Sequence, residues 1–198
     1  MTIFHLLRHG ERQQSRVLVG RMPGIGLSAQ GRAEIAMVAE RLAAEPIAAI
    51  YASPLQRTRE TAEILAARLG LTVAFNDDLL ELDFGEWTGA TFDAIRAHPG
   101  FPAWSNHRSL ARIPGGETMR EVQRRVVEAV FDAGAQHPDA TVVMVSHGDV
   151  IRAALVFALG MPLDFFGRLE VAQGSISTVR IDQAGIRVLA INDRPRLP

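Results

Sequence analysis

The chain has 198 residues, 47% of them hydrophobic, which suits one domain with a sizeable core. Its formal net charge of −1 offers no general attraction for nucleic acid or for an anionic membrane. There is no cysteine and all 21 basic residues are arginine, which excludes disulfides, cysteine-bound zinc, thiol nucleophiles, lysine Schiff bases and the Walker P-loop.

Two features of the sequence bear on where in the cell the protein is located. A charged residue stands as early as Arg8, which is too early for the apolar region of a signal peptide. The longest apolar run, AALVFALGMPL, is much shorter than the ~20 residues of a membrane span. We therefore expect a soluble, cytoplasmic protein that has no membrane partner.

The N-terminal part alternates apolar runs with amphipathic stretches. Residues 2–7 (TIFHLL) predict a first strand, and Ser28 is expected to cap a helix that ends near Glu45. The run IAAIYAS (residues 47–53) predicts a second, buried strand. Ser53, followed by Pro54 and Gln56, has the spacing of a helix cap.

That helix is expected to run to Leu69, with Gly70 at its C-terminal end, and LTVAF (residues 71–75) predicts the third strand. Residues 84–116 then break the alternation with aromatic residues, glycines and prolines, and at most one short helix is expected there, at 92–96. Within a single domain of residues 1–198, this segment is predicted to be a lid or specificity insertion. Its aromatic side chains either line a substrate pocket or form the core of the lid: Phe84, Trp87, Phe92, Phe101 and Trp104.

Regular elements resume near Glu117 with a long amphipathic helix. The run ATVVMVS (residues 140–146) predicts a fully buried strand, and a helix is expected over residues 149–159. Residues 175–192 resemble a hairpin that turns at 183–185. This order predicts an α/β fold, a three-layer α/β/α sandwich with a mainly parallel central sheet. The hairpin leaves one strand edge without a partner. Two copies of the chain can pair through such an edge, so a homodimer is compatible with the sequence.

Polar groups gather where the predicted strands end. Arg8, His9 and Gly10 follow the first strand, and His147 and Gly148 follow ATVVMVS. Arg57 falls in the first turn of the helix after the second strand. Because parallel strands present their carboxyl ends at one edge of a sheet, we expect these groups to face one crevice.

Such a crevice suits a phosphate group. Guanidinium groups and helix N-termini donate hydrogen bonds to phosphate oxygens, and glycine lets the backbone approach them closely. A neutral histidine nitrogen attacks phosphorus when the other ring nitrogen is held protonated. Phosphoryl transfer depends mainly on positioning and charge stabilisation, so the sequence predicts a site with no metal and no cofactor.

The leaving oxygen also needs a proton. Glu81 follows the third strand and enters the predicted lid, where partial burial would raise its pKa and keep it protonated as a general acid. Asp83 and Glu86 are rival acids in the same stretch.

Blocks of sequence spread over nearly the whole chain resemble the histidine phosphatase superfamily, in the branch of cofactor-dependent phosphoglycerate mutases and their phosphatase relatives. The blocks are LLRHGE, YASPLQRTRETA, LLELDFGEWTG, PGGET and VMVSHGDVIRA. The resemblance implies a phosphoglycerate mutase-like fold with His9 as the nucleophile that becomes phosphohistidine. It implies that Arg8, Arg57 and His147 hold the phosphoryl group. It also places Glu81 at the position of the family's proton donor.

In its FGEW motif and its short length, the chain resembles the phosphatases, including α-ribazole phosphatase and fructose-2,6-bisphosphatase, more than the longer mutases. We therefore expect a metal-independent phosphatase acting on a small phosphate monoester. Two alternatives remain open: a phosphoryl-transferring phosphoglycerate mutase, and a phospholigand-binding regulatory protein without turnover.

The chain departs from the family pattern just after its first motif. Arg12 stands where the family usually has Thr or Ser, and Ser15 stands where it usually has Asn. The Asn normally helps to bind the phosphoryl group, whereas Arg12 is predicted to reach a second anionic group of the substrate. Gly10, Arg12, Ser15 and Gly148 are therefore candidate substrate contacts.

Overall fold

A computed structural model describes residues 1–13 and 16–194 of the chain. The strands found in this part are β1 (Thr2–Arg8), β2 (Ile47–Ala52), β3 (Val73–Phe75), β4 (Thr141–Ser146), β5 (Ile176–Asp182) and β6 (Gly185–Asp193). They form one sheet in the order β3-β2-β4-β1-β5-β6. β1 to β4 pair in parallel, and β5 runs antiparallel to both β1 and β6. The mainly parallel sheet with a C-terminal hairpin is as predicted.

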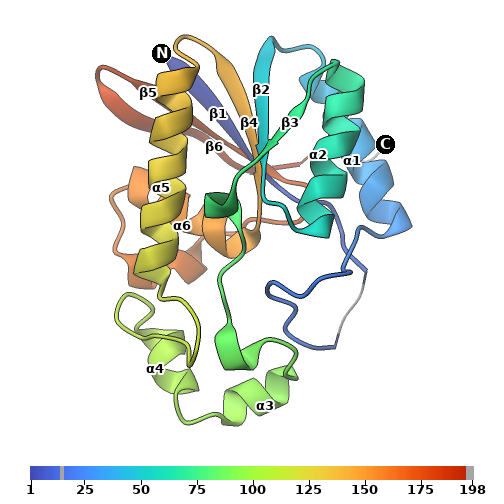
Figure 1. Cartoon of the computed structure of the whole chain (residues 1–198). Helices are drawn as coiled ribbons and strands as arrows, with labels where there is room; N and C mark the ends of the chain where they lie inside the picture. Colours follow the sequence, from blue (N-terminus) through green and yellow to red (C-terminus); the bar gives the residue numbers. More distant parts are fainter. Residues whose placement is uncertain (14–15, 195–198) are drawn as a thin grey trace.

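Helices cover both faces of the sheet, so the predicted three-layer sandwich is confirmed (Figure 1). One face carries α1 (Ala29–Leu42) and α2 (Gln56–Leu69), whose apolar sides pack on the buried side chains of β2 and β4. The other face carries α5 (Met119–Gln136) and α6 (Gly148–Ala158). Short 3-10 turns complete the connections at Asp77–Leu79, Gly85–Trp87 and Leu163–Arg168.

The longest helix shows how local sequence defines an element. Thr118 caps α5 by accepting a hydrogen bond from the Glu121 backbone N–H at 3.2 Å, while the Glu121 carboxylate accepts one from the Thr118 N–H at 2.8 Å. This reciprocal capping box satisfies N–H groups that the first turn leaves free. Met119, Val122 and Val126 recur at helical spacing and are buried against the sheet.

Three details of the sequence prediction were wrong. α1 ends at Leu42 rather than near Glu45, because Glu45 precedes Pro46 and proline disfavours helical backbone in the residue before it. A second short helix, α4 (Phe101–Asn106), lies in residues 84–116 besides α3 (Phe92–Ala97). Six residues are too few to show a helical period in the sequence.

The third error concerns Ser53. The N-cap of α2 is Leu55, and the Ser53 hydroxyl lies 3.5 Å from the Leu55 nitrogen, a marginal contact. Its stronger partner is the His147 ring, at 2.9 Å. The capping role of Ser53 was predicted from local spacing. The pairing of β2 with β4 instead brings Ser53 to a partner that is distant in the sequence.

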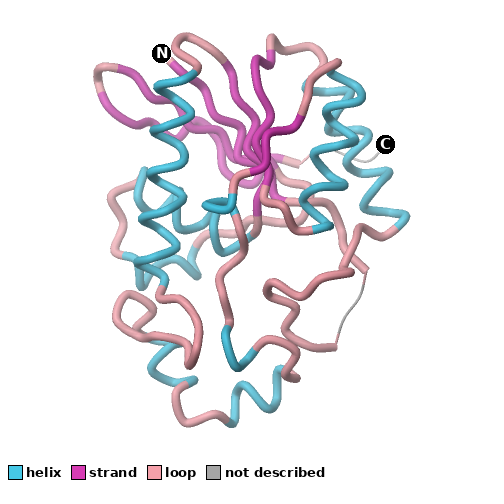
Figure 2. The backbone as a smooth tube through the Cα atoms, in the orientation of Figure 1, coloured by secondary structure: helices cyan, strands magenta, loops and turns pink. Residues whose placement is uncertain are grey.

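Residues 84–116 lie beyond the carboxyl ends of the parallel strands (Figures 1 and 2). Their backbone is tied to the loop after β1, since the Leu18 N–H donates to the Ala90 carbonyl at 2.9 Å and the Gly89 N–H donates to the Leu18 carbonyl at 2.8 Å. Inside the segment, the rings of Trp87 and Trp104 meet edge to face at 5.3 Å. This placement agrees with a lid, while its function as a lid, like the single-domain organisation, stays a prediction.

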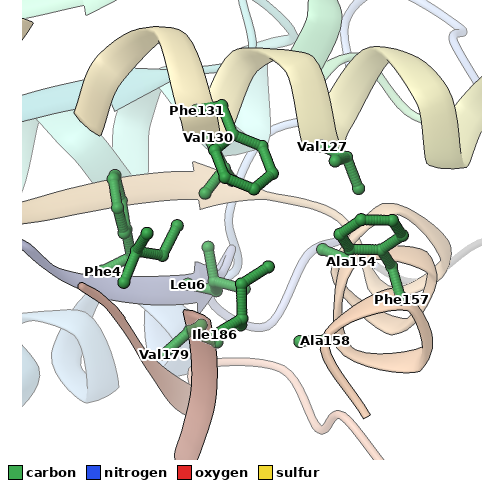
Figure 3. A pocket seen from close by; sticks show the side chains of 11 residues that line it. Phe4, Leu6, Val127, Val130, Phe131, Ala154, Phe157, Ala158, Val179 and Ile186 are labelled. Atoms are coloured by element: carbon green, nitrogen blue, oxygen red, sulfur yellow. The ribbon is translucent and has the colours of Figure 1, made fainter. Parts of the chain in front are cut away.

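An apolar groove runs between α5, α6 and the β5–β6 hairpin (Figure 3). Phe131 and Phe157 stand at its rim, each with 44% of its surface exposed. The residues that line it in the described part of the chain include none of the predicted site residues. No helix among residues 1–13 and 16–194 is both long enough and apolar enough to cross a membrane.

Candidate active site

The ends of three neighbouring strands bring the predicted site together. Arg8 at the end of β1 is in register with Ser146 at the end of β4, and the His9 N–H donates to the Ser146 carbonyl at 3.1 Å. On the other side of β4, the Ser53 N–H donates to the Val145 carbonyl at 3.0 Å. His9, His147 and Ser53 therefore follow adjacent strands and meet at one edge of the sheet.

The His9 ring is held in one orientation. Its Nδ1 lies 2.8 Å from the Gly10 carbonyl oxygen, which can only accept, so Nδ1 carries the proton and Nε2 keeps its lone pair. Only 2% of the residue is exposed. Burial, followed by the charges of Arg57 and Arg8, holds the pKa of His9 well below its usual value. A neutral ring with a free Nε2 is the form that attacks phosphorus.

His147 lies beside His9, and the two ring centroids are 5.4 Å apart. The residue is fully buried, and its Nε2 shares a hydrogen bond with the Ser53 hydroxyl at 2.9 Å. Burial lowers the pKa of His147 well below its usual value, and the charge of Arg57 lowers it further. Its Nδ1 is buried and has no partner among the described residues. His147 also occupies the N-cap of α6 without forming a side-chain cap there.

The two arginines retain unpaired donors. Arg57 is 2% exposed, and its Nη2 donates to the Gly20 carbonyl at 2.8 Å. Arg8 donates from Nη1 to the Val171 carbonyl at 2.7 Å. Arg57 Nη1 and Arg8 Nε are buried and find no acceptor in residues 1–13 and 16–194. Burial lowers the pKa of Arg57 to about 10, so it stays charged at neutral pH. Buried cationic donors without acceptors favour an anionic ligand such as phosphate.

Gly10 and Gly148 have packing reasons for being glycine. A Cβ at Gly10 would lie 2.7 Å from the Ile35 side chain and 2.8 Å from the Gly31 carbonyl, so it would push α1 away. A Cβ at Gly148 would stand 3.1 Å from the Arg8 guanidinium carbon. Close contact of either glycine with a substrate stays a prediction.

Glu81 lies in the same electrostatic environment. Burial and, after it, the charge of Asp149 raise the pKa of Glu81 to about 7, against the opposing charge of Arg57. Its Oε1 accepts a hydrogen bond from the Leu82 N–H at 3.0 Å. The rival acids are placed differently: Asp83 accepts from the Gly85 N–H at 2.9 Å and faces Arg21 at 3.6 Å, and Glu86 is exposed. Among these acids, the raised pKa of Glu81 suits a general acid at neutral pH.

The backbone of Glu81 is fixed by a cluster that the sequence analysis missed. Arg21 Nε and Arg125 Nη2 both donate to the Glu81 carbonyl oxygen, at 2.7 and 3.3 Å. Glu117 Oε2 accepts from Arg21 at 2.9 Å, from Arg125 at 3.1 Å and from the Asp83 N–H at 2.9 Å. The only sequence signal was the presence of Glu117 in the PGGET block.

Replacing Glu117 with glutamine is expected to lower the free energy of unfolding by about 1–3 kcal/mol. The change leaves Arg21 and Arg125 without their shared carboxylate, and the Arg125 side chain is only 11% exposed. Urea unfolding measures the loss. Glu128→Gln, an exposed glutamate on α5, is the matched control and should change stability by about 0.5 kcal/mol or less. Equal stability of the two variants would contradict the role of Glu117.

The loop after β1 contains the remaining candidates. Arg12 Nη1 donates to the Gln13 carbonyl at 2.8 Å. Burial lowers the pKa of Arg12, and the negative charge of Glu81 opposes that shift. Ser15 lies outside the described residues. The described part of the chain contains no group of three or more His, Asp or Glu side chains that could hold a metal ion.

Comparisons with known proteins agree with this geometry. The sequence matches the histidine phosphatase superfamily (branch 1) over residues 4–194. It is 30% identical over 192 residues to phosphoserine phosphatase 1 of Hydrogenobacter thermophilus, covering 94% of this chain and 90% of that protein. It is 32% identical over 181 residues to the probable phosphoglycerate mutase GpmB of Salmonella choleraesuis, covering 88% and 83%. The solved structure of Bacillus stearothermophilus YhfR is similar with a TM-score of 0.92 at 29% identity, covering 98% of both chains.

Proposed function

Because the chain belongs to the histidine phosphatase superfamily, we propose that it hydrolyses a small phosphate monoester through a phosphohistidine formed on His9. The observation that carries the proposal is the His9 ring. It is buried and neutral, its Nδ1 is hydrogen-bonded to the Gly10 carbonyl, and its Nε2 is left free to attack. The unpaired donors of Arg8 and Arg57 support the binding of a phosphoryl group beside it.

In the first step, His9 Nε2 forms a bond to phosphorus and the phosphorus–oxygen bond to the alcohol breaks. Glu81 donates its proton to the leaving oxygen and becomes a carboxylate. Arg8 and Arg57 donate hydrogen bonds to the phosphoryl oxygens and offset their negative charge through the transfer. His147 is buried beside His9, so the incoming dianion favours a donor or protonated state of its ring.

In the second step, water attacks the phosphohistidine. The Glu81 carboxylate takes one proton from that water, the remaining hydroxyl bonds to phosphorus, and the bond to His9 Nε2 breaks. Inorganic phosphate leaves, His9 is again neutral, and Glu81 is again protonated. Over one cycle, Glu81 therefore gives one proton to the alcohol and regains one from water, so that the protonation of the chain is unchanged.

The pKa of Glu81 predicts a pH dependence. The first step needs protonated Glu81, so kcat/KM should fall as pH rises through about 7. Asp149→Asn removes a negative charge that raises the pKa of Glu81, and the alkaline limb should therefore move to lower pH. Both enzymes are assayed on one substrate, so that ionisation of the substrate cancels. Asp132→Asn, an exposed change on α5, should leave the limb in place; an unmoved limb in Asp149→Asn would contradict the coupling.

A mutase is the second candidate, favoured by the similarity to GpmB. It would return the phosphoryl group of His9 to another substrate oxygen instead of to water. Phosphate release and 3-phosphoglycerate isomerisation are measured side by side, with and without bisphosphoglycerate. We expect phosphate release to dominate, also in the presence of EDTA; isomerisation without release would support the mutase. Absence of both activities on every ester of a phosphometabolite panel would favour the regulatory protein.

Several finer expectations accompany the proposal. The partner is a phosphorylated small molecule, and relatives carry the names of enzymes for such compounds. Four further points stay predictions. They are a cytoplasmic location, a homodimer that pairs through the β5–β6 hairpin, activity without a metal ion, and the contact of Arg12 with a second anionic group of the substrate. The contact of Arg12 is tested with an Arg12→Ala variant. Unchanged kinetics of that variant on every anionic substrate would contradict the contact.

A further inference from the structure

A cavity of about 230 Å³ lies where three parts of the chain meet. Leu18 contributes from the loop after β1, and Asp149 contributes from the first turn of α6. The rest of the wall comes mainly from the aromatic and aliphatic side chains of residues 84–116, among them Phe84, Trp87, Ile95 and Trp104.

The wall of this cavity is held in shape by contacts that its lining residues make with one another and with their neighbours. Leu18 is fixed through its backbone hydrogen bonds with Gly89 and Ala90. The Phe84 and Trp104 rings meet edge to face at 6.2 Å. The guanidinium carbon of Arg108 stacks 3.7 Å from the centre of the Trp104 ring. A preformed wall loses little entropy when a ligand enters, so the cavity is suited to binding.

The position of the cavity suits it to receive the alcohol that leaves from the phosphate ester. Asp149 lines it from the first turn of α6, the helix whose N-cap is His147, so the cavity adjoins one of the proposed phosphate-binding residues. Phe84, another lining residue, follows Glu81 by three positions in the chain. Glu81 must reach the oxygen that leaves with the alcohol. The carbon skeleton attached to that oxygen therefore extends toward the cavity.

The charged groups of the lining are already paired. Asp149 contacts Arg152 at 3.3 Å, and Arg96 contacts Asp93 at 3.0 Å. Among the described lining residues, the one buried polar side-chain atom without a partner is the indole nitrogen of Trp87. A hydroxyl-rich or zwitterionic group would lose its hydration here with little compensation, whereas an apolar group gains from burial.

We propose that this cavity binds the leaving alcohol and selects uncharged, largely apolar groups, of the aryl-alkyl class, over sugars and hydroxy or amino acids. Its size supports this class, because an apolar cavity of about 150 Å³ already holds benzene. The larger volume accommodates one ring and a short linker. The inference rests on the proposed phosphatase activity and adds the chemical class of its substrate.

The test compares esters of primary alcohols, so that differences in leaving-group acidity stay small. Phosphate release is measured for ethyl phosphate, 2-phenylethyl phosphate, phosphoserine and glucose 6-phosphate. We expect kcat/KM for 2-phenylethyl phosphate to exceed that for ethyl phosphate by about tenfold or more, as burial of a phenyl group allows. Phosphoserine and glucose 6-phosphate should fall below 2-phenylethyl phosphate by a similar factor.

Two variants fill the cavity from different segments of the chain: Leu18→Trp from the loop after β1, and Ile95→Phe from α3. Each should bring the ratio of kcat/KM between 2-phenylethyl and ethyl phosphate down toward one. Leu110→Phe, a change at a side chain that is 73% exposed in the same segment, should leave that ratio unchanged.

The outcomes separate this inference from the proposed function. A wild-type ratio near one, or faster turnover of phosphoserine or glucose 6-phosphate than of 2-phenylethyl phosphate, overturns the inference and leaves the phosphatase in place. A high ratio that both filling variants preserve also overturns it. The absence of phosphate release from every ester would instead overturn the proposed function.

Discussion

Replacing His9 with alanine is expected to lower phosphatase turnover by a factor of about 10⁴ or more, because it removes the atom that bonds to phosphorus. Arg8, Arg57 and Glu81 remain in the variant, so the substrate should still bind. The loss therefore falls on kcat rather than on KM. Phosphate release from one ester, followed in wild type and variant, measures it.

A second readout tests the covalent intermediate. Brief mixing with ³²P-labelled substrate should leave acid-labile label on the wild-type protein and none on His9→Ala. His107→Ala is the matched control, because His107 is an exposed histidine at the end of α4. That control should keep both turnover and label. Substantial turnover in His9→Ala, with the variant folded by circular dichroism, would refute His9 as the nucleophile.

The sequence predicted the fold well because its apolar residues follow simple periods. All residues of β4, which lies within the run ATVVMVS, are buried. The apolar residues of α5 recur at helical spacing. Once the strands were placed, the edge at which parallel strands end was determined. The meeting of Arg8, His9 and His147 followed from that rule and not from any local pattern.

Contacts between distant segments could not be predicted in the same way. Ser53 has the spacing of a helix cap, yet the pairing of β2 with β4 makes it the partner of His147. Glu117 and Arg21 are 96 positions apart, and nothing in either stretch indicates their ion pair. Asp149 was read as the start of a helix, whereas its charge raises the pKa of Glu81. Such roles depend on tertiary register, which a single sequence does not show.

Replacing Glu81 with glutamine is expected to slow hydrolysis of an alkyl phosphate by about 10²- to 10⁴-fold, because glutamine cannot protonate the leaving alkoxide. The effect should depend on the ester. Nitrophenolate is a stable anion and leaves without a proton, so the first step with p-nitrophenyl phosphate should survive. The second step should still slow, since no carboxylate accepts the proton of the attacking water.

This difference gives the variant a kinetic signature. With p-nitrophenyl phosphate, Glu81→Gln should release a burst of nitrophenol close to one per active site and then turn over slowly, while labelled phosphohistidine accumulates. Glu86→Gln, the exposed rival acid, should behave like wild type on both esters. An equal loss on alkyl and nitrophenyl esters without a burst would show that Glu81 does not transfer the proton. A burst with the nitrophenyl ester, together with slow cleavage of the alkyl ester, would assign both proton transfers to this one carboxyl, whose pKa of about 7 suits it to act as acid and then as base.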